Sequence, residues 1–361
     1  MPTRSETLAC AAGLRTMFEA QGAALVEPPI LQPADTLLEL YGEDIRARAY
    51  VTSDALRGEQ MLRPDFTVPV VQMHMREGAE PARYTYAGEV FRRQEHDPSR
   101  ANEYIQVGYE VFDRTDPAAA DAEVFALIAV GLKDLPVAPV TGDIGVLMAA
   151  VEGLNTTARR KHALMRHIWR PRRFRGLLER FAGRTPVPPT RAALLAGEAP
   201  KGAPLVGLRS AAEIDARVAT LREDAAADPI SARDVDLIEV LLEVRETMPN
   251  ALSRLHDLAV DLPSIAPAVA RVAAREKALQ ARGVDTDALI FEASYGRASM
   301  EYYDGFVFGF RAETRPDLPA IASGGRYDAL TRQLGQGDEI PAVGGVMRPG
   351  LMLQLEGKAW R

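Results

Sequence analysis

A segment in the first third of the chain carries side chains whose types and spacing suit the binding of a charged ligand. It alternates with a period of two, so that Gln106, Gly108 and Glu110 share one face while apolar residues occupy the other. This is the pattern of a β-strand that rests on a core. The part that ends at Arg92 predicts a partner strand, and the polar residues 93–103 predict the loop that joins the two strands.

A strand face that presents a guanidinium, an amide and a carboxylate suits a zwitterionic ligand. Glu110 would meet an ammonium group, and Arg92 would meet a carboxylate or a phosphate, through charge-assisted hydrogen bonds. The same alternation also describes the solvated outer face of an antiparallel sheet. On spacing alone, that second interpretation is favoured.

Four further stretches accompany this segment in a fixed order along the chain. They read LRPDFT at 62–67, MEYY at 300–303, SGGRYD at 323–328 and GGVMR at 344–348. Together with Phe91-Arg92 and QVGYEVF at 106–112, they resemble the histidyl branch of the class II aminoacyl-tRNA synthetases. The resemblance covers nearly the whole chain. It implies an α+β fold in which an antiparallel sheet is flanked by helices and interrupted by a helical insertion.

The predicted domains follow the change in sequence character along the chain. Residues 141–285 are Ala-rich and read mainly as helices, separated by Pro- and Gly-containing breaks, which matches the insertion in place and size. Residues 1–140 and 286–361 would form the synthetase-like core. Only about a dozen residues follow Arg348, too few for a domain. We therefore expect no C-terminal anticodon-binding domain.

The resemblance also implies which residues hold a ligand. Positions that bind the ammonium, carboxylate and imidazole of histidine in the family correspond to Asp65, Thr67, Arg92, Gln106, Glu110, Tyr303 and Tyr327. Asp65 stands where the family carries Glu, and its position equally suits a helix cap. Arg92, Arg100 and Arg348 take positions that contact ATP phosphates and would form a vestigial nucleotide site. The pair Gly324-Gly325 predicts either a close backbone approach to a ligand or a tight turn.

Two departures from the synthetase pattern point away from catalysis. The special arginine of the family aligns with Ala298, and the neighbouring Arg297 would point to the opposite face of an extended segment. Gln94 replaces the glutamate that binds the adenine amino group. Losing a cation at a transition state lowers a rate by orders of magnitude. A retained amino-acid site with a damaged reaction centre suggests a sensor rather than an enzyme.

The chain accordingly resembles the histidyl-tRNA-synthetase-like regulatory subunits of ATP phosphoribosyltransferase. The resemblance implies a partner, the short-form catalytic subunit, and an effector, histidine, with no cofactor and no charging of tRNA. A truncated synthetase that forms histidyl-adenylate is the alternative. A third hypothesis is an RNA-binding module that uses a basic run. Its members are Arg159, Arg160, Lys161, Arg166, Arg170, Arg172, Arg173 and Arg175. A solvated or partner-facing helix surface explains that run better.

Composition sets the remaining expectations. A net charge of −7 argues against nucleic acid as the main partner. A single cysteine, Cys10, excludes an internal disulfide, and no histidine spacing predicts a metal site. No signal peptide and no apolar run of about twenty residues is present, so a cytoplasmic protein is expected. Pro28 and Pro29 lie where the family forms its homodimer interface, with Pro29 at the position of the motif's proline. The resemblance therefore implies a homodimer within a larger hetero-oligomer.

Overall fold

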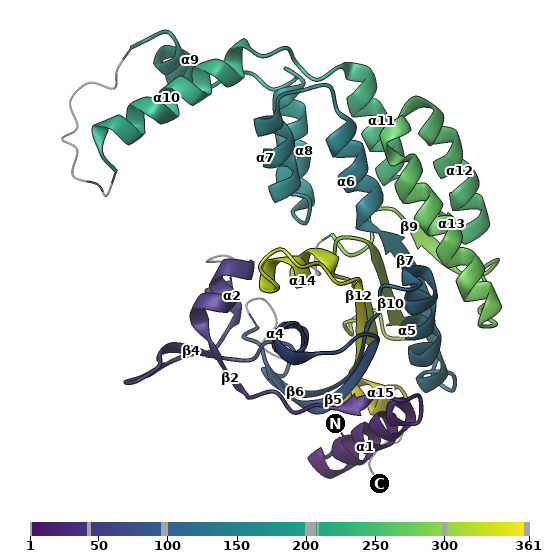
Figure 1. Ribbon diagram of the computed structural model, residues 1–361. Helices are drawn as coiled ribbons and strands as arrows, with labels where there is room; N and C mark the ends of the chain where they lie inside the picture. The colour runs from purple at the N-terminus through teal and green to yellow at the C-terminus, as the bar shows by residue number, and fades with distance from the viewer. Residues whose placement is uncertain are drawn as a thin grey trace.

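A large curved sheet lies beneath an arch of helices in the computed structural model (Figure 1), which describes residues 2–41, 45–94, 100–198, 207, 209–297 and 302–356. Within these residues the main sheet has nine strands, in the order β1-β5-β6-β12-β11-β10-β7-β9-β8. Most neighbouring strands are antiparallel; β1 with β5 and β7 with β9 are parallel. This arrangement confirms the predicted fold class.

The strands of the main sheet come from both ends of the chain. They are β1 (Ala24–Leu25), β5 (Ala82–Phe91), β6 (Glu103–Phe112), β7 (Val137–Asp143), β8 (Arg245–Thr247), β9 (Ile290–Glu292), β10 (Phe306–Ala312), β11 (Ala322–Arg326) and β12 (Ala342–Met347). A smaller sheet pairs β2 (Leu31–Pro33), β4 (Gly58–Leu62) and β3 (Val51–Asp54). The predicted pairing of β5 with β6 is confirmed, and the two strands lie second and third from one edge of the main sheet.

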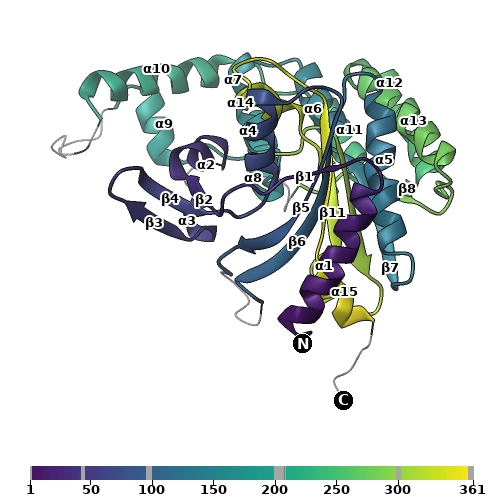
Figure 2. The same cartoon turned by 60° about the horizontal axis from the view of Figure 1, so that its bottom comes forward.

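One face of the main sheet is covered by apolar helices. They are α1 (Arg4–Glu19), α5 (Pro117–Gly131) and α15 (Pro349–Leu355), and they lie beside one another in Figure 2. Phe18 of α1 stacks on Tyr109 with ring centroids 5.1 Å apart. Phe125 of α5 packs on the three phenylalanines of β10, which share that face because side chains alternate along a strand. This packing forms the core.

The opposite face of the sheet holds the polar residues of the predicted site. Helices α4 (Thr67–Glu77) and α14 (Asp328–Leu334) lie on this side (Figure 1). Phe66 precedes α4 and stacks on Tyr86 of β5, with ring centroids 4.2 Å apart and planes 9° from parallel. The neighbouring strands β5, β6 and β12 each present one face to these helices. Side chains that are distant in the sequence therefore meet beneath the helices.

The arch above the sheet consists of helices from the middle of the chain. They are α6 (Ile144–Gly153), α7 (Ala158–Arg166), α8 (Pro171–Phe181), α9 (Pro189–Leu195), α10 (Ala211–Ala226), α11 (Ala232–Leu242), α12 (Met248–Asp261) and α13 (Ala266–Ala281). Two short helices, α2 (Ala34–Tyr41) and α3 (Ile45–Arg48), lie near the small sheet. Strand β8 lies within the predicted insertion, yet pairs with β9 at the sheet edge. The domain boundaries stay a prediction.

Local sequence signals explain several helix starts. Asp116 accepts a hydrogen bond from the Ala119 backbone N–H (3.0 Å), with Pro117 at the first helical position of α5. Ser231 caps α11 in the same way through Asp234. Among the described helices, none has the length and apolar character needed to cross a bilayer.

The tight-turn alternative for Gly324-Gly325 is wrong. Both residues lie inside β11, opposite Gly345 and Gly344 of β12. A Cβ atom on Gly324 would lie 2.3 Å from the Gly344 carbonyl oxygen, and one on Gly325 would lie 2.5 Å from that of Phe306. The glycines are needed because the sheet leaves no room for side chains at these positions.

We expect the aromatic layer between β10 and α5 to dominate stability. Phe308 is fully buried against Phe125 and its two strand neighbours. Phe308→Ala should lower the free energy of unfolding by about 3–5 kcal/mol, since it leaves a cavity. Val130→Ala on α5, where the side chain is 54% exposed, should change it little. Urea unfolding of both variants checks this, and equal effects would contradict it.

Candidate ligand site

The centre of the candidate site is the side chain of Glu110 on β6, which is 1% exposed. Its carboxylate accepts three hydrogen bonds, from the hydroxyls of Tyr327 (2.6 Å), Tyr86 (2.8 Å) and Thr67 (3.3 Å). Gly344 of β12 lies directly opposite, and a Cβ atom there would sit 1.4 Å from Glu110 Oε2. Glycine at this position is therefore a condition for placing the carboxylate on the sheet.

Burial shifts the ionisation of this carboxyl. Removal from water raises the pKa of Glu110 to about 7, against the opposing effect of the three hydroxyl donors. Among the described residues, no cationic side chain forms an ion pair with Glu110. The group is therefore poised to ionise fully when a cationic ligand arrives, because an opposite charge favours the ionised form.

Asp65 and Arg92 form a charged pair in the candidate site. Asp65 Oδ2 lies 3.9 Å from Arg92 Nη2, and the Arg92 Nε–H donates to the Pro64 carbonyl oxygen (2.7 Å). Asp65 Oδ1 lies 3.5 Å from the Val68 backbone nitrogen, at the limit of a hydrogen bond. The structure thus places Asp65 near the start of α4 and beside Arg92. The N-cap position of α4 is Phe66, with no side-chain cap, and the ligand-binding role of Asp65 stays a prediction.

Gln106 and Arg348 extend the polar surface along the sheet. Gln106 is 1% exposed, and neither its amide oxygen nor its amide nitrogen has a hydrogen-bond partner. Buried polar groups without partners are costly, which is typical of a ligand-binding position. Arg348 donates to the Ala320 carbonyl oxygen (2.7 Å) and to Ser323 Oγ (3.2 Å). Burial lowers the pKa of Arg348, and the charge of Arg92 acts in the same direction, whereas Tyr104 opposes both.

The burial of Glu110 and Gln106 overturns the solvated-face interpretation. An outer face of a sheet would leave these side chains in water, whereas both are 1% exposed. This face of the sheet is covered by α4, by α14 and by the segment that contains Tyr303. The sequence alone did not show that these elements lie against the sheet. The spacing was informative only about which residues share a face.

Tyrosines complete the enclosure. Tyr303 is 7% exposed, its ring centroid lies 6.3 Å from that of Tyr327, and its carbonyl oxygen accepts a hydrogen bond from Trp169 Nε1 (3.3 Å). Tyr302 donates to Thr67 Oγ1 (3.3 Å). Sequence reasoning did not assign Tyr86 or Tyr302 to the site. The signal for Tyr86 was its register opposite Gly108, which leaves space for the ring.

Two predicted positions are not tested by these contacts. Ala298, aligned with the special arginine, lies outside the described residues. Arg100 is exposed at the end of the β5–β6 loop, next to undescribed residues 95–99. Its assignment to a nucleotide site remains a prediction. Among the described residues, no cluster of three His, Cys, Asp or Glu is placed to hold a metal ion.

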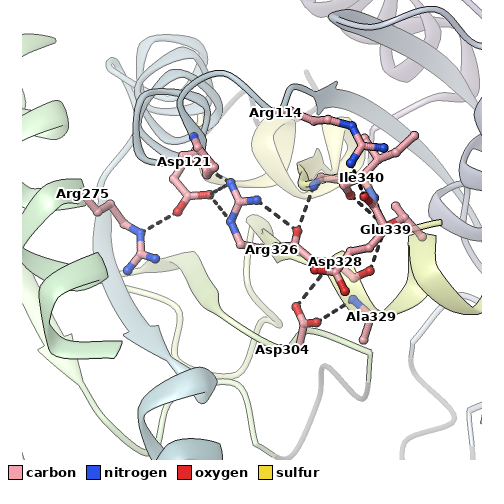
Figure 3. Close-up of polar contacts among 12 residues, drawn as sticks. Arg114, Asp121, Arg275, Asp304, Arg326, Asp328, Ala329, Glu339 and Ile340 are labelled. Atoms are coloured by element: carbon pink, nitrogen blue, oxygen red, sulfur yellow. Dashed lines mark hydrogen bonds and ion pairs between the residues drawn. The ribbon is translucent and has the colours of Figure 1, made fainter. Parts of the chain in front are cut away.

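A buried ionic network fixes the chain next to Tyr327 (Figure 3). Arg326 donates to Asp121 Oδ1 through Nη2 (2.7 Å) and Nε (3.0 Å), and to Asp328 Oδ1 (3.0 Å). Arg275 of α13 donates to the other oxygen of Asp121 (2.7 Å) and pairs with Asp143 (2.9 Å). The network therefore joins the site strand β11 to α5, to β7 and to α13 of the helical arch.

Asp304 anchors the other side of the same turn. Its carboxylate accepts hydrogen bonds from the backbone N–H groups of Asp328 (3.1 Å) and Ala329 (2.6 Å), at the start of α14. Burial, together with the nearby charge of Asp328, raises the pKa of Asp304 to about 7. Asp328 in turn accepts from the Ala342 backbone N–H (2.9 Å), which ties α14 to β12. Tyr327 is thus held between two fixed anchors.

Comparisons with known proteins identify the family to which the chain belongs. The family model described as "Histidyl-tRNA synthetase" matches residues 2–203 and 209–349. The chain is 32% identical to the ATP phosphoribosyltransferase regulatory subunit of Brucella anthropi over 354 residues, which cover 92% of this chain and 93% of that protein. The protein of the same name from Brucella canis is also 32% identical, over 357 residues and with the same coverage.

The chain belongs to the family of histidyl-tRNA-synthetase-like regulatory subunits of ATP phosphoribosyltransferase. Solved structures agree in fold. The ATP phosphoribosyltransferase regulatory subunit/histidyl-tRNA synthetase from Bacillus halodurans has a TM-score of 0.72 at 19% identity, covering 99% of this chain and 81% of that one. Histidyl-tRNA synthetase from Nostoc sp. PCC 7120 has a TM-score of 0.64 at 17% identity, with 96% and 70% covered. The family supports a regulatory role in histidine biosynthesis.

We expect Glu110 to make stability depend on pH. A pKa raised from 4.5 to about 7 contributes stability that is fully present below pH 4.5 and is lost as the pH rises through 7. The free energy of unfolding of the native chain, relative to Glu110→Gln, should therefore fall by about 3 kcal/mol between pH 4.5 and 7.5. Tyr86→Phe removes a donor to the carboxylate and should move this fall to higher pH. Urea unfolding across this range checks both, and a pH-independent difference would refute the burial argument.

The ionic network should be far more costly to break than an exposed ion pair. Asp121→Asn weakens the contacts to two buried guanidinium groups and should lower the free energy of unfolding by about 3 kcal/mol. Asp317→Asn makes the same chemical change in the exposed pair with Arg315 and should leave stability nearly unchanged. Thermal or urea unfolding of the two variants measures the contrast. Similar losses in both would show that burial does not set the cost.

Proposed function

We propose that this chain binds histidine at the site around Glu110 and regulates a short-form ATP phosphoribosyltransferase catalytic subunit. In this role it activates the partner and transmits feedback inhibition by histidine. The observation that carries the proposal is a buried carboxylate that has hydroxyl donors but no cationic partner among the described residues. The names of the relatives, which are regulatory subunits of this enzyme, supply the partner.

The geometry suits each part of an amino acid. Glu110 accepts from an ammonium or imidazole N–H, and Asp65 adds a second carboxylate within the same face. The guanidinium of Arg92 suits a ligand carboxylate. So does the amide of Gln106, whose side-chain oxygen and nitrogen have no hydrogen-bond partner. Tyr303 and Tyr327 enclose the ligand and exclude water, which strengthens every charged contact.

Transmission of the signal needs a path from the site to a distant surface. Tyr327 donates to Glu110, and the adjacent Arg326 belongs to the buried network that reaches Arg275 of α13. A ligand that draws the hydroxyl of Tyr327 into a new position therefore acts on a rigid connection to the helical arch. The required coupling free energy is on the order of 1–3 kcal/mol.

An enzymatic alternative rests on the two retained arginines. Arg92 and Arg348 are close enough that the charge of the first lowers the pKa of the second, after the larger effect of burial. Two such cations suit the phosphates of ATP. Histidine-dependent exchange between pyrophosphate and ATP would support a chain that forms histidyl-adenylate. Absence of exchange, together with regulation of the partner, would refute this alternative.

The decisive experiment is the turnover of a short-form catalytic subunit with and without this chain, across a histidine titration. We expect strong activation that histidine reverses. No change in turnover, with no complex detected by sedimentation, would refute the regulatory proposal. Direct calorimetry with histidine separates binding to this chain alone from binding that requires the complex.

Site variants test the assignment of the effector site. Glu110→Gln and Asp65→Asn should each weaken the histidine response about tenfold or more, because each removes a charge-assisted hydrogen bond, while activation of the partner persists. Asp317→Asn, on the exposed surface, is the matched control and should respond as the native chain does. An unchanged histidine response in Glu110→Gln would place the effector elsewhere.

A further inference from the structure

A second unsatisfied charge lies outside the proposed histidine site. The Arg297 side chain is 4% exposed, its Nε–H donates to the Ile168 carbonyl oxygen (2.9 Å), and its guanidinium carbon lies 4.8 Å from the centroid of the Phe174 ring. Its Nη2 has no hydrogen-bond partner, and no carboxylate pairs with it in the part of the chain that the structure describes. A buried cation without a counter-charge is costly.

Further positive charges lie near Arg297, although one of them, Arg175, also pairs with Glu239 (4.0 Å). Ile168 lies in the turn from α7 into α8, and Phe174 lies in the first turn of α8, a helix of 11 residues whose N-terminus has no side-chain cap. Burial, and then the charge of Arg175, lowers the pKa of Arg297 to about 10. The backbone N–H groups in the first turn of α8 add the partial positive charge of a helix N-terminus.

Further cations gather around the same turn. Arg166, Arg172 and Arg173 are exposed. His167 Nδ1 is buried without a partner, and burial lowers the pKa of His167, followed by the charges of Arg170, Arg173 and Arg166. So many like charges repel one another unless an anion lies among them. The later members of the basic run, from Arg166 onward, therefore lie around this turn. Arg160, by contrast, lies at the other end of α7 and pairs with Asp224 (2.8 Å).

We propose that the turn between α7 and α8 binds a small phosphate-bearing molecule. The phosphate lies at the N-terminus of α8 and accepts hydrogen bonds from the backbone N–H groups of Arg172 and Arg173. Pro171 has no N–H, and the N–H of Phe174 donates to the Arg170 carbonyl oxygen. The Arg172 and Arg173 guanidinium groups bind its outer oxygens, which they fit in a bidentate manner. Arg297 supplies its charge from beneath the turn. The ligand class is a nucleotide, a phosphorylated sugar or pyrophosphate.

The arrangement favours a compact anion over a nucleic acid. RNA backbones follow a groove or stripe of cations, whereas these side chains surround a single helix terminus and the chain as a whole carries a net charge of −7. The turn also contacts the histidine site, because Trp169 donates to the Tyr303 carbonyl oxygen (3.3 Å). In Figure 1 the turn lies at the end of the α7–α8 pair that faces the main sheet. This phosphate site does not depend on the proposed histidine site.

Calorimetric titration with inorganic pyrophosphate, at fixed ionic strength, tests the proposal. We expect the native chain to bind pyrophosphate saturably. In the double variant Arg172→Gln/Arg173→Gln, one equivalent of this binding should be lost or weakened at least about tenfold. Arg217→Gln, an exposed arginine of α10, is the matched control and should bind as the native chain does. Arg297→Met should lose the same equivalent without losing thermal stability, because it removes an uncompensated buried charge.

Three outcomes would overturn the proposal. The first is the absence of saturable pyrophosphate binding to the native chain. The second is unchanged stoichiometry and affinity in the double variant, which would assign binding to other cations such as Arg92 and Arg348. The third is binding of a single-stranded RNA 12-mer with steep salt dependence and no binding of pyrophosphate, which would assign the cluster to nucleic acid.

Discussion

The burial of one ionisable carboxylate on the sheet is the constraint on which the rest of this structure depends. Glu110 lies where a Cβ atom on the facing Gly344 would overlap its oxygen. Hydroxyl donors partly offset the desolvation of the carboxyl, but no cation does so among the described residues. The register that sets Gly344 opposite Glu110 makes room for that group, and the tyrosines that cover the sheet shield it from water.

Rigid support of this site requires charges of its own. Tyr327 can hold its hydroxyl against Glu110 only if the backbone on both sides is fixed. Arg326 and Asp304 provide that support through Asp121 and the first turn of α14. Because these contacts are buried, they have few alternative arrangements and break at a large cost. The same contacts extend to α13, so the support of the site is also its mechanical connection to the helical arch.

The sequence was informative where chemistry and periodicity coincide. Alternation identified the face shared by Gln106 and Glu110, and the sequence pattern identified the partner strand that ends next to Arg92. It could not show what covers that face, because the covering residues, such as Phe66 and Tyr303, come from segments distant in the chain. The sequence predicted either a ligand approach or a turn at Gly324-Gly325, because a pair of glycines is compatible with both. Only the pairing of β11 with β12 shows that these glycines are required by strand packing. Partners of Arg326 were invisible for the same reason: ion pairs between residues 205 positions apart have no local signal.

Two buried ionisable groups of opposite sign lack a counter-ion among the described residues, and one hydrogen bond connects their surroundings. Glu110 lacks a cation and Arg297 lacks an anion among the described residues, and Trp169 connects their surroundings through Tyr303. Each group is destabilised until a ligand of the right charge is bound, so each ligand stabilises a particular arrangement of the Tyr303 segment. If both ligands favour the same arrangement, each raises the affinity for the other; if they favour different ones, each lowers it. Thermodynamic linkage requires that the factor be equal in both directions. Under the two proposals, the chain responds to both an amino acid and a phosphate compound because it holds two buried charges that lack counter-ions among the described residues.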